Sequence, residues 1–167
     1  MNNIIGLLFI IIFGGLGLIS IFVVINLLLP VPIERTRAAL ETSPARSLLL
    51  GLINFLCVGV LDALLIWLAQ LTSSVKVVSG ILVIIGGLIT LALTLLAFLG
   101  LASLADLLGQ HMGEPKTEFQ AIMRGGVLLL LAALTPFIGW FAFTPLVIFV
   151  SLGAAIQAIV RRNEKAA

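Results

Sequence analysis

The chain has 167 residues, of which 62% are hydrophobic and only 10% are charged, and its mean hydropathy is +1.33. A soluble domain has about 25% charged residues, so this chain lacks the polar residues that would cover a soluble globular surface. The formal net charge is +2, and the nine basic residues lie in short polar stretches, which argues against the basic stripe of a nucleic-acid-binding protein. A bilayer's hydrocarbon core is about 30 Å thick and needs about 20 helical residues, so the long apolar runs predict membrane-spanning helices.

The first apolar run covers residues 4–29 and predicts the first span. The residues before it include no lysine or arginine, and the run is longer than the apolar core of a signal peptide, so we interpret it as a retained span. Gly14, Gly15 and Gly17 lie near its middle. They either let another helix approach closely or are simply tolerated, as glycine is in membrane helices.

A charged connection follows the first run and predicts a short helix at the membrane surface over residues 32–41. Pro32 suits the first position of a helix. Ile33, Thr36 and Leu40 fall on one side of that helix, as expected for an element that lies along an interface.

Two further apolar spans, residues 47–71 and 77–105, are separated by a short turn and predict a helical hairpin. A second charged connection covers residues 106–124. Within it, Pro115 predicts the start of a second surface helix over residues 115–123.

The last apolar run, residues 125–160, is much longer than one span requires. Pro136, Gly139 and Pro145 cluster at its middle, and proline disrupts a helix by removing a backbone donor. We therefore expect two shorter helices joined near residues 135–144. They either cross the membrane twice or form a re-entrant hairpin.

The distribution of basic residues supports this break, because lysine and arginine favour the cytoplasmic side of a membrane. If the last run turns back, every basic residue except Lys76 lies on one side. A single crossing would divide them almost evenly. We therefore predict an outside N-terminus, an inside tail and five membrane-crossing segments, with Arg46 and Arg124 as headgroup anchors and Trp140 as an aromatic anchor at the outer interface.

The predicted fold is an all-α integral membrane protein with one transmembrane domain over residues 1–167. It is a bundle of about five transmembrane or re-entrant helices with two short interfacial helices.

Asp62 is the candidate for chemistry, because an ionisable group inside a span is costly and suggests a function by default. Asn54 lies two turns earlier on a similar face. Together they predict an intramembrane polar site for a proton or a cation. The alternative is structural: Asp62 would reach outward toward Lys76 or cap a helix restarted after Gly59.

Other chemistry finds little support in the sequence. His111 is the single histidine and has too few neighbouring ligands for a metal site. The single cysteine, Cys57, excludes an internal disulfide and is expected to be a small buried hydrophobic residue. No glycine-rich phosphate loop or Ser-His-Asp set is present. We therefore expect no enzymatic activity, no metal and no cofactor.

The two halves of the chain share a loose plan, in which a proline starts a short charged helix that ends in arginine before an apolar run. Four segments, residues 32–41, 44–52, 135–140 and 151–155, resemble a bacterial membrane domain that follows the β-helical repeats of polymer-forming, bactofilin-like proteins. The resemblance covers roughly residues 16–162, but this chain has no β-helical part and no Gly-Pro pair in the turn at 72–76. It implies the bacterial inner membrane and no catalytic residues.

These observations favour a non-catalytic integral membrane protein that acts as an accessory or scaffold subunit of a larger bacterial membrane complex. Its expected partners are the lipid bilayer and other membrane subunits or further copies of itself, with no nucleic acid. The alternative function is a small oligomeric transporter or channel around Asp62 and Asn54.

Overall fold

A computed structural model describes residues 2–72, 75–113 and 117–164, and these residues are almost entirely helical. This confirms the all-α prediction. The elements are α1 (Asn2–Leu28), α2 (Pro30–Thr42), α3 (Pro44–Leu71), α4 (Lys76–His111), α5 (Glu118–Leu134), the π-helical segment η1 (Ile138–Phe143) and α6 (Thr144–Glu164).

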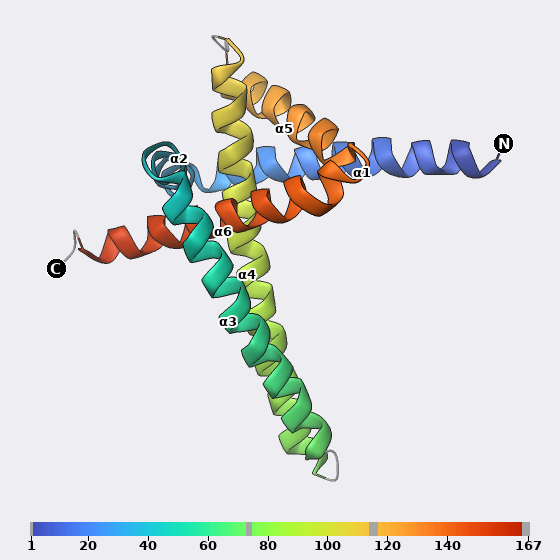
Figure 1. Cartoon of the computed structure of the whole chain (residues 1–167), viewed down its shortest axis with the longest axis vertical. Helices are drawn as coiled ribbons and strands as arrows, with labels where there is room; N and C mark the ends of the chain where they lie inside the picture. Colours follow the sequence, from blue (N-terminus) through green and yellow to red (C-terminus); the bar gives the residue numbers. More distant parts are fainter. Residues whose placement is uncertain (1, 73–74, 114–116, 165–167) are drawn as a thin grey trace.

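The helices do not form a parallel bundle. α3 and α4 make a long antiparallel hairpin, whose tip extends away from the other elements (Figure 1). α1 and α6 run across α4, and α5 packs on the half of α4 that is distant from the tip. The predicted hairpin is confirmed, and the core lies where the other helices meet its base.

Burial changes sharply along the hairpin. At the base, α4 buries Gly100, Ala102 and Ala105 against its neighbours. Toward the tip, large apolar side chains such as Val60 and Ile84 are more than half exposed. Cys57 is also exposed, so its predicted burial is wrong. Cys57 therefore lies on a part of α3 that no described helix covers.

Small residues allow unusually close helix crossings at the base. An ideal Cβ on Gly153 of α6 would overlap the carbonyl oxygen of Ser47 in α3 and lie 2.7 Å from the backbone nitrogen of Gly51. The crossing of α5 over α4 is similar, because a Cβ on Gly125 would lie 2.8 Å from the nitrogen of Gly109. Such backbone contact is typical of helix packing in membranes.

The last apolar run is broken where the sequence predicted. α5 ends at Leu134, Pro136 occupies the turn, and Phe137 has a φ of 65°. The chain then continues through η1 into α6. Pro145 lies in the first turn of α6, directly after η1, and does not interrupt the helical stretch Ile138–Val160.

The first predicted surface helix is confirmed as a helix, and the second is not a separate element. α2 buries Ile33, Thr36 and Leu40, the face that its sequence predicted. Pro115 lies outside the described residues. α5 starts at Glu118 and continues without a break into the apolar stretch. The Thr117 side chain accepts a hydrogen bond from the backbone N–H of Gln120.

Four of the described helical stretches are long and apolar enough to cross a membrane: Phe9–Leu28, Pro44–Leu71, Lys76–His111 and Ile138–Val160. The first part of the last apolar run belongs to α5, which has 17 residues. At about 1.5 Å per residue it is shorter than the roughly 30 Å hydrocarbon core.

Candidate intramembrane polar site

Asp62 lies inside the hairpin and connects its two helices. The Thr90 hydroxyl of α4 donates a hydrogen bond to Asp62 Oδ2. The other carboxylate oxygen, Oδ1, is buried and has no hydrogen-bond partner among the described residues. Gly86 makes room for it, because an ideal Cβ at Gly86 would lie 3.0 Å from Oδ1. The site is therefore a carboxyl group with one satisfied and one unsatisfied oxygen.

Neither structural role that the sequence suggested for Asp62 is observed. α3 continues through Gly59 to Leu71, so no helix restarts there for Asp62 to cap. The described ion pairs join Arg37 to Glu41 and to Asp106, and none joins Asp62 to Lys76.

Asn54 does not join Asp62 in one hydrogen-bonded cluster. Its amide donates to the Leu50 carbonyl oxygen, 3.1 Å away in its own helix. The candidate site therefore consists of Asp62 and Thr90. Leaving a buried acceptor unpaired costs about 1–3 kcal/mol, and a cation bound at Oδ1 would offset that cost.

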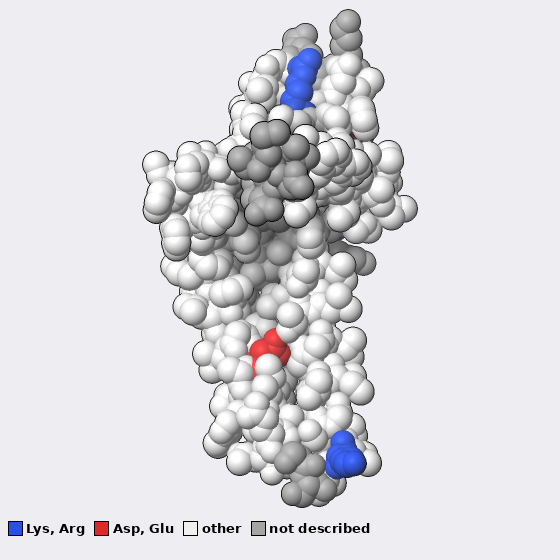
Figure 2. Space-filling view, turned by 90° about the vertical axis from the view of Figure 1, so that its right-hand side faces the viewer, with Lys and Arg blue, Asp and Glu red and all other residues white. Residues whose placement is uncertain are grey.

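The surroundings of Asp62 are apolar. Figure 2 shows a hairpin face that is largely uncharged, with an acidic patch in its lower half and a basic patch at its lower end. Asp62 is the single acidic residue of α3. The acidic patch therefore stands alone on a surface suited to lipid or to another apolar helix.

The three predicted interface anchors are all exposed, but they lie in different contexts. Arg46 lies in the first turn of α3, and Arg124 lies in the middle of α5. Trp140 in η1 is 67% exposed. Arg46 and Lys76 bracket the apolar stretch of α3, as expected for charges at the two ends of a span.

The ion pair between α2 and α4 could not be predicted from the sequence. Arg37 Nη1 of α2 donates to Asp106 Oδ2 of α4 over 3.0 Å, and the Asp106 side chain is only 6% exposed. Gln110 Nε2 also donates to both Asp106 oxygens, at 3.2 and 3.1 Å. Asp106 was expected in a loop, whereas α4 continues to His111 because this carboxylate finds partners inside the protein.

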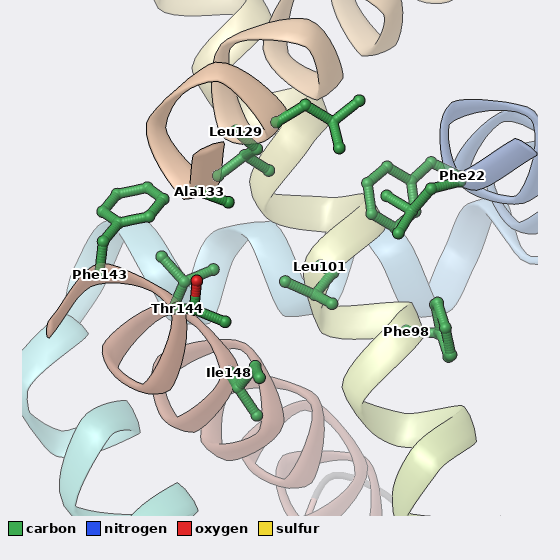
Figure 3. A pocket seen from close by; sticks show the side chains of 11 residues that line it. Phe22, Phe98, Leu101, Leu129, Ala133, Phe143, Thr144 and Ile148 are labelled. Atoms are coloured by element: carbon green, nitrogen blue, oxygen red, sulfur yellow. The ribbon is translucent and has the colours of Figure 1, made fainter. Parts of the chain in front are cut away.

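A separate cavity of about 240 Å³ lies where α1, α4, α5 and α6 meet (Figure 3). Phe22, Leu101 and Leu129 are among the apolar residues around it. Thr144 is the one lining residue with a side-chain hydroxyl, and that hydroxyl donates to the Gly139 carbonyl oxygen at 2.7 Å. No unpaired polar side chain of the described residues enters this cavity, so it suits hydrocarbon and offers no group for chemistry.

No family model, curated protein or solved structure matches this chain. The resemblance to the membrane domain of bactofilin-like proteins therefore stays a prediction.

Metal-binding and nucleophilic groups remain scattered in the described part of the chain. It contains no group of three or more His, Cys, Asp or Glu side chains that could hold a metal ion. A ring nitrogen of His111 lies 2.9 Å from the Leu107 carbonyl oxygen of its own helix.

Proposed function

We propose that the chain is a multi-pass integral membrane protein that acts as a non-catalytic accessory or scaffold subunit of a bacterial inner-membrane complex. The observation that carries this proposal is the exposed apolar surface of the α3–α4 hairpin. In the most apolar 18-residue window of each helix only 6% of residues are buried. Such a surface is stable when lipid or another membrane helix covers it.

The dimensions of the hairpin support its insertion in a bilayer. α3 has 28 residues, or about 42 Å at 1.5 Å per residue, which exceeds the hydrocarbon core with room for the charged ends. α1 and α6 run across the hairpin (Figure 1). They must therefore tilt steeply or lie near the membrane surface when the hairpin stands upright, and labelling can determine which.

The proposed topology predicts different labelling at the two ends of the hairpin. In a Cys57→Ser background, we expect Thr42→Cys and Met112→Cys to resist an impermeant thiol reagent in intact cells. Val75→Cys, beside the turn at the tip, should react. All three positions are exposed or half exposed, so protection would come from the membrane and not from burial.

Cell lysis provides the control, because all three cysteines should then react. Ala167→Cys tests on which side of the membrane the tail lies. It should be protected in intact cells, as Thr42→Cys should be. Labelling of Thr42→Cys and Met112→Cys in intact cells, with Val75→Cys protected, would reverse the orientation. Equal labelling of all three positions in intact cells would contradict a membrane-inserted hairpin.

The accessory role predicts defined partners. Native mass spectrometry of the chain, extracted in mild detergent, should show a fixed stoichiometry with other membrane subunits. A homogeneous assembly of this chain alone would instead favour the second candidate function, a small oligomeric transporter or channel.

The observation that favours this second candidate is the unpartnered Oδ1 of Asp62. If Asp62 carries a proton or cation, Asp62→Asn should abolish flux through proteoliposomes that contain the purified chain. Thr94→Val is the matched control, because Thr94 lies one turn after Thr90 and its hydroxyl donates only to its own helix. An accessory subunit should show no such flux and should keep its partners in Asp62→Asn.

A further inference from the structure

A second cavity, of about 380 Å³, lies where α1, α2, α4 and α5 meet, and its lining is mainly polar. Its polar residues are Asn26, Glu34, Arg37, Asp106, Gln110 and Glu118. Cavities that bind small ligands typically measure about 300–1,000 Å³, so this one has room for a small polar group.

The charge of the lining is negative. Three carboxylates face one guanidinium, and that guanidinium is already paired with Asp106 at 3.0 Å. Glu34 and Glu118 are exposed, and neither forms an ion pair with a described residue. Two carboxylates at the cavity therefore have no ion-pair partner among the described residues, which favours a cation there.

Asn26 provides an observation that is independent of the charges. Its side chain lines the cavity, the residue is only 9% exposed, and no described group hydrogen-bonds to its amide. The amide can therefore bond to a group that occupies the cavity. Its amide oxygen is an acceptor, so a ligand with an N–H donor would satisfy it.

We propose that this cavity binds a primary ammonium group. The ammonium would donate to the Asn26 amide oxygen and be neutralised by Glu34 and Glu118, while Arg37 and Gln110 hold the Asp106 carboxylate in place. The group could belong to a lipid headgroup of the ethanolamine type or to a free amine. The proposal goes beyond the scaffold role, and only its lipid form depends on membrane insertion.

The test uses the full chain in nanodiscs. For the lipid source, native mass spectrometry should show phosphatidylethanolamine retained in preference to phosphatidylcholine, whose headgroup has no N–H donor. If the ligand is a free amine, calorimetry in phosphatidylcholine nanodiscs should show binding of ethanolamine or putrescine. Binding in either arm supports the site and identifies its source. Absence of binding in both arms overturns it.

Variants that remove carboxylate charges distinguish binding at this cavity from a general attraction of cations to the protein. Combining Glu34→Gln with Glu118→Gln should weaken binding at least about tenfold, as expected for lost charge-assisted hydrogen bonds. Glu41→Gln is the matched control, because Glu41 is on the same helix as Glu34, does not line the cavity, and contacts the site only through a half-exposed ion pair with Arg37 at 3.9 Å. Equal weakening by the control variant and the double variant would contradict the site.

Asn26→Leu should also weaken binding, since leucine offers no acceptor. Its thermal unfolding midpoint should be compared with that of the unsubstituted chain. Unchanged binding in a folded Asn26→Leu variant would show that the ammonium does not contact this residue, and would overturn the proposed geometry.

Discussion

Gly153→Ala is expected to lower the free energy of unfolding by about 1–3 kcal/mol, the range for overpacking a tightly packed core. The added methyl group would overlap the Ser47 carbonyl oxygen and lie 2.7 Å from the Gly51 nitrogen. Ordinary contacts of a Cβ lie at 3.4–4 Å. Both neighbours are backbone atoms of α3, so no side-chain rotation can relieve the overlap, and α6 must move away from α3.

The matched control is Gly59→Ala, which adds the same methyl group to α3 itself. A Cβ at Gly59 would meet nothing within 4 Å. Alanine is also the better helix former, so this variant should be as stable as the unsubstituted chain or slightly more stable. Titration of the purified protein with a denaturing detergent, followed by circular dichroism, measures both variants. Equal stability of Gly153→Ala and Gly59→Ala would show that α3 and α6 do not pack as described.

The sequence contained a signal for these crossings. Ser47 and Gly51 are four residues apart, as are Ala105 and Gly109. This spacing places small residues on one face of a helix, where two backbones can approach. The spacing indicates that a helix has a contact face but does not identify its partner. Only the folded chain shows that Gly51 meets α6 and that Gly109 meets α5.

Local backbone rules predicted the elements better than their arrangement. Pro136 marked the break after α5, and the apolar side of α2 was evident from Ile33, Thr36 and Leu40. By contrast, α1 is apolar around most of its circumference. Its sequence therefore has no polar face to indicate which side packs, and its crossing of α4 could not be predicted.

Charge was the least reliable guide to the ends of elements. The stretch after Ala105 was expected to be a loop because it contains Asp106 and His111. A charged side chain can continue a helix when a distant residue neutralises it. Here the distant residue is Arg37, which is 69 positions earlier in the chain. Such a pairing becomes visible only after α2 has packed against α4.

Arg37→Ala should therefore destabilise the protein strongly, by about 3–5 kcal/mol, the range for breaking a buried ion pair. The variant leaves the Asp106 carboxylate, which is 6% exposed, with Gln110 as its remaining partner among the described residues. The matched control is Arg35→Ala on the same helix. Arg35 is exposed and forms no ion pair with a described residue, so its loss should change the stability little.

A double variant distinguishes the ion pair from simple loss of packing. Combining Arg37→Met with Asp106→Leu removes both charges and retains most of the side-chain volume. Replacing a buried ion pair by apolar residues is often neutral or stabilising, so the double variant should recover most of the stability lost in Arg37→Ala. If detergent titration shows that Arg37→Met alone recovers as much stability as the double variant, the loss in Arg37→Ala comes from packing of the Arg37 side chain and not from the uncompensated Asp106 charge. If Arg37→Ala instead matches Arg35→Ala, then Asp106 is not held by Arg37, and the contact of α2 with α4 rests on the apolar face of α2 alone.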